Sequence, residues 1–135
     1  MILGIDYGTK RIGIAIADRE LKIAMPHSTL QGRHEATRDA RIVTDLGAAE
    51  NAECFVVGLP VNMDGSDSPQ TELTRRFAAE LGRLSNLPVH LQDERLSSFA
   101  AEEVMEAAGV RAAKRKDLLD RIAAQKILQA YLDQT

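Results

Sequence analysis

The sequence predicts an α/β fold in which a mixed five-stranded sheet is flanked by helices. Two apolar runs with strand-like alternation, joined by a short connection containing Gly8, predict an antiparallel hairpin over Ile2–Asp18. After one further strand, segments of helical and strand periodicity alternate along the chain, which is typical of parallel strands with helical crossovers. Because functional groups in open α/β sheets gather at strand ends, carboxylates in those positions are candidate site residues.

Asp6 is the first of these carboxylates and ends a strand that the pattern places near the centre of the sheet. Period two puts it on the same face as Gly4 and Gly8, and Gly13 lies on the returning strand. We expect these small neighbours to let a bulky substrate approach. An ionised aspartate is costly to bury, so a cation, a basic partner or solvent must compensate for its charge.

Asp6 has three interpretations. It could be a turn residue that caps the turn over Tyr7–Thr9. It could belong to a phosphate-binding hairpin, as in actin-like ATPases and sugar kinases, or it could be a metal ligand in a nuclease of the RNase H type. Actin-like proteins need two facing domains, whereas 135 residues predict a single domain over 1–135, so the second interpretation loses weight.

Composition and charge restrict the class of protein. The chain is 44% hydrophobic and 27% charged, as expected for a folded domain, and its net charge of −3 gives no general attraction to nucleic acid. Any such binding therefore needs a local basic patch. The sequence has no apolar run long enough to span a membrane and no leader at Met1, and its one cysteine, Cys54, lies in an apolar run. We expect a buried thiol in a cytoplasmic protein without membrane contact.

The elements after the hairpin follow from local patterns. A strand over Leu21–Leu30 contains Pro26, which cannot donate to a ladder, so this strand is expected at a sheet edge or with a bulge. The next segment, Ala36–Asn51, has apolar residues at helical spacing and places Asp39 on a polar face of the predicted helix. Cys54–Leu59 is fully apolar and predicts a strand buried on both sides.

The second half of the chain alternates in the same way. After a polar loop over Val61–Pro69, the Ser68-Pro69 pair predicts the start of a helix with proline at its first position. The remaining predicted elements are the helix Pro69–Leu84, the strand Pro88–Gln92, the helix Phe99–Ala108 with Gly109 as its C-cap, and the helix Asp117–Leu132.

Asp120 lies on the last predicted helix, at the centre of its apolar stripe and in line with Ile127. An ionised carboxylate on a face that packs against a sheet needs compensation. A structural interpretation pairs Asp120 with Arg121 or Arg11, or makes the segment from Asp117 an acidic first turn that the helix dipole favours. A functional interpretation makes Asp120 part of a metal site.

Asp6, Asp120 and one member of the pair Asp93-Glu94 are expected at one edge of the sheet. Adjacent strand residues face opposite ways, so only one of the pair should point inward, and spacing does not decide which. Asp117 is a similar rival to Asp120. Three converging carboxylates suit hard divalent cations such as Mg²⁺ or Mn²⁺. Two such ions, about 3.5–4 Å apart, can activate water and stabilise the leaving oxygen in phosphodiester cleavage.

Four motifs follow one another along the chain: Asp6–Gly13, Val57–Pro60 with Asn62–Ser66, Asp93–Leu96, and Leu119-Asp120 followed by Ala123-Ala124 and Ile127–Gln129. With these motifs in this order, the chain resembles the YqgF family of RNase H-like proteins, which are assigned as Holliday-junction resolvases or pre-16S rRNA nucleases. The resemblance covers essentially all 135 residues. One small departure is Ser97-Ser98, where relatives often have threonine.

The resemblance implies an RNase H-like fold and assigns Asp6, Glu94 and Asp120 as the catalytic and metal-ligating residues. It implies a divalent-metal-dependent endonuclease of the two-metal type that acts on structured RNA or branched DNA. We favour processing of the pre-16S rRNA 5′ end in ribosome biogenesis. The alternatives are a Holliday-junction resolvase in DNA recombination and repair, and a non-catalytic nucleic-acid-binding module in transcription. A resolvase is expected to act as a two-fold homodimer, whereas a monomer would favour the role on RNA.

Basic residues supply the local patch that nucleic acid would need. Lys10, Arg11 and Arg95 flank the expected metal site and could contact phosphates, although both arginines could instead neutralise the carboxylates. The one dense basic cluster, just before the helix of Asp120, could position the nucleic-acid backbone and comprises Arg111, Lys114, Arg115 and Lys116. With 4% aromatic residues and no Trp, a base-stacking platform for single strands is not expected.

Overall fold

The computed structural model describes residues 1–94 and 112–135 of the chain. Its strands are β1 (Ile2–Tyr7), β2 (Arg11–Ala17), β3 (Ala24–Gln31), β4 (Cys54–Leu59) and β5 (Val89–Asp93), and its helices are α1 (Ala36–Ala49), α2 (Pro69–Ser85) and α4 (Ala112–Asp133). The strands form one sheet in the order β3-β2-β1-β4-β5. β1 pairs antiparallel with β2 and parallel with β4. The predicted α/β fold with a mixed five-stranded sheet is therefore confirmed.

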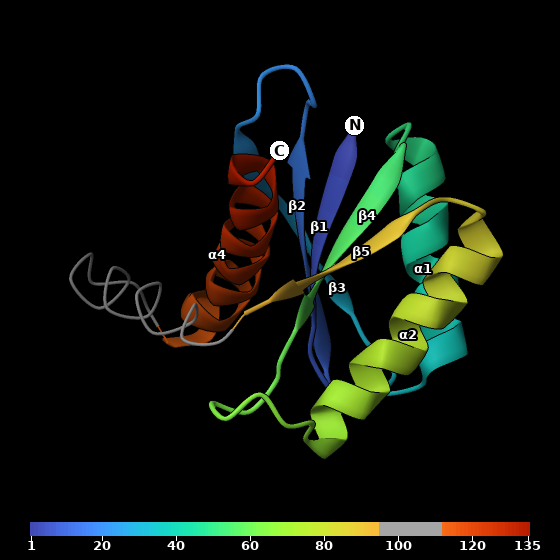
Figure 1. Cartoon of the computed structure of the whole chain (residues 1–135), viewed down its shortest axis with the longest axis vertical. Helices are drawn as coiled ribbons and strands as arrows, with labels where there is room; N and C mark the ends of the chain where they lie inside the picture. Colours follow the sequence, from blue (N-terminus) through green and yellow to red (C-terminus); the bar gives the residue numbers. More distant parts are fainter. Residues whose placement is uncertain (95–111) are drawn as a thin grey trace.

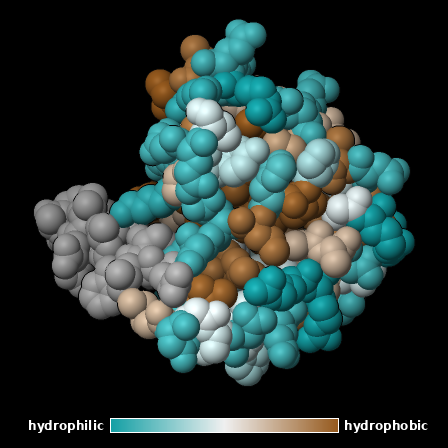
Figure 2. Space-filling view, viewed as in Figure 1, coloured by the Kyte–Doolittle hydropathy of each residue, from teal (hydrophilic) through white to brown (hydrophobic). Residues whose placement is uncertain are grey.

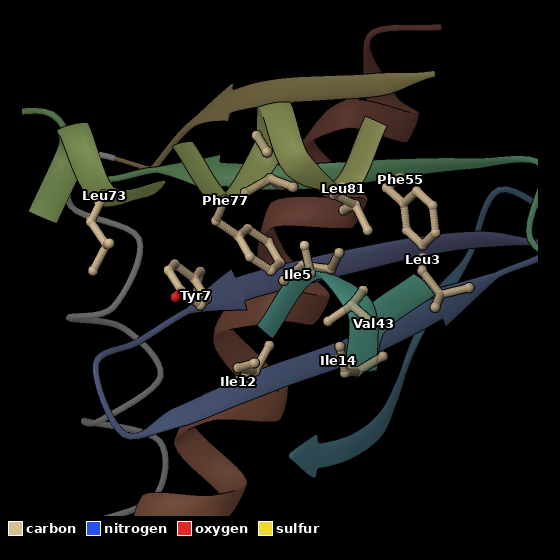
Figure 3. Close-up of a cluster of buried hydrophobic side chains, with 13 residues drawn as sticks. Leu3, Ile5, Tyr7, Ile12, Ile14, Val43, Phe55, Leu73, Phe77 and Leu81 are labelled. Carbon is tan, nitrogen blue, oxygen red and sulfur yellow. The ribbon is translucent and has the colours of Figure 1, made fainter. Parts of the chain in front are cut away.

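Helices cover both faces of this sheet (Figure 1). In the described ranges, α1 and α2 pack on one face around a buried cluster that includes Leu3 and Ile5, which Figure 3 shows in close-up. α4 packs on the opposite face against a second cluster that includes Ile2 and Val56. Because successive strand residues alternate between faces, Asp6 belongs to the face that α4 covers.

The hairpin turn and the edge strand agree with the sequence patterns. The Gly8 N–H donates to the Arg11 carbonyl at 3.0 Å and closes the turn between β1 and β2. β3 lies at the edge of the sheet, and its register against β2 shifts at His27, between Pro26 and Ser28. This additional residue is a β-bulge, so the strand is both at an edge and bulged.

The N-terminus of α2 is tied to the strand ends. Ser68 caps the helix in a reciprocal capping box with Thr71, and the proline occupies the first turn as predicted. The side chain of Gln70 donates to the Tyr7 carbonyl at 2.9 Å, and the Thr71 hydroxyl donates to the Pro60 carbonyl at 2.5 Å. These bonds hold the carboxyl ends of β1 and β4, beside which Asp6 lies.

The prediction that Asp39 lies on a polar face of α1 is wrong. Its side chain is 0% exposed and accepts hydrogen bonds from the Tyr7 hydroxyl at 2.5 Å and from the backbone N–H groups of Arg33 at 2.8 Å and Glu35 at 3.2 Å. Three donors compensate for burying the carboxylate. Burial and the bond to Asp39 raise the pKa of Tyr7. The network fixes the end of β1 on the face opposite Asp6.

The last helix begins earlier than the sequence analysis predicts. α4 starts at Ala112 rather than Asp117, so the basic residues are not before the helix but, from Lys114 onward, within its first turns. Alanine, lysine and arginine all favour helix, and no breaker separates them from the rest of the segment. Asp117 therefore lies beyond the first turn, which removes the acidic-first-turn interpretation. The predicted helix Phe99–Ala108 and its cap Gly109 lie outside the described residues.

The molecular surface is mostly hydrophilic on the face seen in Figure 2. Hydrophobic residues gather near the centre of this view. Leu91 of the edge strand β5 is one of the exposed large hydrophobic residues among those that the structure describes. Cys54 is buried, as predicted. Within the two described ranges, every helix is too short or too polar to cross a lipid bilayer.

Candidate active site

Asp6 lies in β1 between two glycines of the neighbouring strands. The antiparallel register puts it opposite Gly13 of β2. On the other side, the parallel register pairs Ile5 with Val57, so Asp6 and Gly58 are the next residues along β1 and β4. Gly13, Asp6 and Gly58 therefore form one row across β2, β1 and β4. Of these three residues, only Asp6 has a side chain on the face that α4 covers.

α4 crosses the sheet at this row. A Cβ atom on Gly13 would lie 2.0 Å from the carbonyl oxygen of Asp120 and 3.0 Å from its Cβ. The absence of a side chain at Gly13 therefore lets the backbone of α4 come close enough to set Asp120 beside Asp6. Ala124 and Ile127 continue the buried side of the helix, in line with the apolar stripe that the sequence predicts.

Glu94 directly follows β5 and lies on the other side of Asp6. A Cβ atom on Gly58 would lie 2.7 Å from a carboxylate oxygen of Glu94 and 2.4 Å from Cδ1 of Ile127. Gly58 therefore makes room for the Glu94 carboxylate, while Asp93 is exposed. Gly58 is not among the residues predicted for the site, although a glycine inside an apolar strand is a signal of close approach by another group.

The expectation that glycines around Asp6 admit a substrate is wrong. A Cβ atom on Gly4 would lie 2.6 Å from Cβ of Leu128 in α4, and one on Gly8 would lie 2.7 Å from the Arg11 carbonyl oxygen. The space that these glycines leave is filled by the helix and by the turn of the hairpin itself. Their role is close packing of α4 on the sheet and closure of the turn.

Burial and like charges raise the pKa of two carboxyl groups in the site. Burial, followed by the charge of Asp120, raises the pKa of Asp6 from 3.8 to about 6. Burial, followed by the charges of Asp6 and Asp93, raises the pKa of Glu94 from 4.5 to about 8. Asp6 is thus electrostatically linked to both of the other predicted site carboxylates. Such shifts cluster at functional sites, where a cation or a proton resolves the repulsion.

Asp120 forms an ion pair with Arg11. Nε of Arg11 donates to Oδ2 of Asp120 at 2.6 Å, and the two side chains are 35% and 18% exposed. This bond agrees with the structural interpretation of both residues, in which Arg11 compensates for the charge on α4. Arg121, the other partner considered for Asp120, instead donates from Nε to the Thr29 hydroxyl at 3.2 Å.

The chemistry of the donor set fits a divalent cation. Asp6, Glu94 and Asp120 offer carboxylate oxygens, which hard cations such as Mg²⁺ and Mn²⁺ prefer. A cation would relieve the repulsion that raises the pKa of Asp6 and Glu94. Among residues 1–94 and 112–135, however, no three His, Cys, Asp or Glu side chains are grouped closely enough to hold one ion. The assignment of Asp6, Glu94 and Asp120 as metal ligands therefore stays a prediction.

The predicted nucleic-acid-binding residues are placed only in part. Lys10 is exposed in the hairpin turn, next to Arg11 at the start of β2. In α4, Lys116 is exposed and Arg115 is half-buried, and Lys114 belongs to the first turn of the helix. Arg95 and Arg111 lie outside the described residues.

The raised pKa values predict a pH dependence of stability for the metal-free protein. Asp6 and Glu94 bind protons more tightly when folded than at their ordinary pKa values of 3.8 and 4.5. Their contribution to stability is therefore fully present at low pH and is lost as pH rises through about 6 and about 8. We expect the free energy of unfolding in urea to fall between pH 5.5 and 8.5 and to fall less in Glu94→Gln. An equal fall in both proteins would contradict this assignment.

The sheet order and the helices on both faces define an RNase H-like α/β protein. The chain belongs to the RuvX family, whose model, described as Holliday junction resolvase, matches residues 1–134. RuvX is the YqgF family, so the resemblance inferred from the four motifs is confirmed. The family is one of nucleases, which are hydrolases acting on nucleic acid.

Related proteins match the chain over almost its whole length. A protein of Rhodopseudomonas palustris (strain BisB5) is 46% identical over 132 residues, which are 98% of this chain and 82% of the relative. A protein of Maridesulfovibrio salexigens is 44% identical over 133 residues, which are 97% of this chain and 96% of the relative. Both names assign these relatives, provisionally, as pre-16S rRNA nucleases.

Solved structures share the fold at low sequence identity. RuvC of Thermus thermophilus in complex with a Holliday junction substrate has a TM-score of 0.54 and 14% identity, with 97% of this chain and 92% of that chain covered. A second Thermus thermophilus RuvC structure has a TM-score of 0.53 and 11% identity, with 97% and 93% covered. These similarities confirm the RNase H-like fold.

Proposed function

We propose that this protein is a divalent-metal-dependent endonuclease that processes the 5′ end of precursor 16S rRNA. The observation that carries the proposal is the half-buried Asp6 carboxylate at a strand end of an RNase H-like fold. Partial burial and the charge of Asp120 raise the pKa of Asp6, and burial together with the charge of Asp6 raises the pKa of Glu94. Acidic groups that repel one another in this way need a cation to be ionised together. The proposal includes a single nuclease domain over 1–135 that acts in the cytoplasm.

Asp6, Glu94 and Asp120 would hold Mg²⁺ or Mn²⁺. When bound as a pair, such ions supply an activated water and stabilise the leaving oxygen of a phosphodiester. The strand end around Asp6 would hold one ligand in place, because β1 is central and the side chain of Gln70 in α2 donates to the Tyr7 carbonyl at its end. Lys10 and Arg11 would orient the phosphate backbone from the hairpin.

The choice of RNA rests on the relatives. Those at 44–46% identity over nearly the whole chain carry names that specify pre-16S rRNA. The family description specifies Holliday junctions, which makes a junction resolvase the second candidate. A resolvase must cut two opposed strands and is expected to be a two-fold dimer, so oligomeric state separates the two functions.

The test is cleavage of two labelled substrates, a precursor 16S rRNA 5′ region and a four-way DNA junction, with Mg²⁺, Mn²⁺ or EDTA. We expect metal-dependent cutting of the RNA by a monomer. Cutting of the junction alone, by a dimer, would replace the RNA role by the resolvase role. Tight binding without cutting of either substrate would contradict both and indicate a non-catalytic binding module.

A further inference from the structure

We propose that Arg11 is an exchangeable counter-ion of Asp120. In the protein without nucleic acid, its guanidinium neutralises the Asp120 carboxylate. When nucleic acid and a divalent cation bind, the guanidinium leaves Asp120 for a substrate phosphate. The proposal rests on the proposed function and deepens it, since it couples cation binding to nucleic-acid binding through one residue.

The contact between β2 and α4 carries this inference. Arg11 is the first residue of β2, and its Nε reaches Oδ2 of Asp120 at 2.6 Å across 109 positions of sequence. Gly13 is two residues after Arg11 in β2 and lies on the same face of the sheet. Because it has no side chain, it lets the backbone of α4 approach. The same close crossing that sets Asp120 beside Asp6 therefore also brings it within reach of Arg11.

Asp120 lies between opposite charges. On one side it accepts the hydrogen bond from Arg11, and on the other its charge raises the pKa of Asp6. A divalent cation shared by Asp6 and Asp120 would lie close to the guanidinium, and like charges at such separations repel strongly at a partly buried site. Arg11 and the divalent cation therefore compete for one carboxylate.

A phosphate is a suitable second partner for Arg11. A guanidinium has five N–H donors in a planar fork that matches phosphate as well as carboxylate geometry. The Arg11 side chain is 35% exposed, so it can be reached from solvent, and its neighbour Lys10 is exposed in the hairpin turn. Moving from Asp120 to a phosphate would replace one charge-assisted hydrogen bond by another. Because coupling between two ligands is reciprocal, nucleic acid would in turn favour binding of the cation.

A double-mutant cycle in EDTA tests the exchange without metal or cleavage. The affinity of a fluorescent precursor-rRNA fragment would be measured by anisotropy at pH 8 for wild type, Asp120→Asn, Arg11→Gln and the double variant. Asp120→Asn releases Arg11, so affinity should rise about 1.5- to 5-fold, the range for losing a partly exposed ion pair. In the Arg11→Gln background, most of this gain should disappear.

Asp6→Asn is the matched control, because it removes one negative charge from the same site without touching the bond from Arg11. An equal gain from Asp6→Asn and Asp120→Asn, or the same Asp120→Asn gain with and without Arg11, would overturn the exchange. If wild type still cuts RNA with Mn²⁺ in that case, the proposed function stands and only this inference fails. If wild type neither binds nor cuts nucleic acid, the proposed function fails and this inference with it.

A second measurement keeps all three carboxylates. Calorimetric titration of Mn²⁺ into Arg11→Gln should show binding about 1.5- to 5-fold tighter than in wild type, because the competing cation is gone. Unchanged or weaker Mn²⁺ binding in Arg11→Gln would overturn the competition.

Discussion

Asp6→Asn is expected to lower metal-dependent cleavage about a thousandfold or more while leaving the protein folded and at least as stable. Asparagine keeps the shape of the side chain but removes the charge that the proposed metal site needs. Burial and the charge of Asp120 already disfavour ionised Asp6, since they raise its pKa to about 6. Removing that charge should therefore raise the melting temperature of the metal-free protein at pH 8. Cleavage rates and thermal unfolding of the same preparations give both results.

The control for this experiment is Asp117→Asn. Asp117 is an exposed carboxylate of α4, one turn before Asp120, and its neutralisation should change cleavage by no more than about twofold. Cleavage at the wild-type rate by Asp6→Asn would mean that Asp6 is only a turn residue, or that a contaminant cuts. A large loss of stability in Asp6→Asn would instead indicate a structural role for the charge.

Gly13→Ala is expected to destabilise the protein by about 3 kcal/mol and to reduce cleavage severely. The new Cβ would lie 2.0 Å from the carbonyl oxygen of Asp120 and 2.5 Å from its carbonyl carbon. Both atoms belong to the backbone of α4, so no side-chain rotation can remove the clash. The helix must move away from the sheet, and Asp120 moves with it. Urea unfolding and cleavage assays measure the two effects.

Gly82→Ala in α2 provides the contrast. A Cβ there would meet its nearest neighbour, Cγ2 of Val89, at an ordinary 3.6 Å. Alanine is favoured over glycine within a helix, so this variant should be about 0.5–1 kcal/mol more stable than wild type. If Gly13→Ala were as stable and active as Gly82→Ala, close crossing of α4 over the sheet would not be what positions Asp120.

Strands and their faces could be predicted because those patterns depend on local chemistry. Cys54–Leu59 is buried at all six positions, as expected of a wholly apolar strand in the middle of a sheet. Pro26 has no N–H to donate, and β3 is accordingly an edge strand with a bulge beside it. Alternation alone placed Asp6 on the face opposite Ile5.

Contacts between distant segments could not be predicted in the same way. Asp39 has the local sequence of an exposed helix residue, and only the fold brings the Tyr7 hydroxyl and two backbone N–H groups to it. The start of α4 at Ala112 has no cap signal among its helix-forming neighbours. That the Glu94 carboxylate lies against Gly58 depends on how β5 ends beside β4. The surroundings of Asp39 and of Glu94 are thus decided by tertiary packing.

The most direct test of the proposed metal site is calorimetric titration of Mn²⁺ into metal-free protein at pH 8. Wild type and Asp117→Asn should bind Mn²⁺ saturably with equal affinity, and Asp6→Asn and Glu94→Gln should bind at least about tenfold more weakly. Equal binding by wild type and Asp6→Asn, or no binding by wild type, would contradict the assignment of these carboxylates as a metal site.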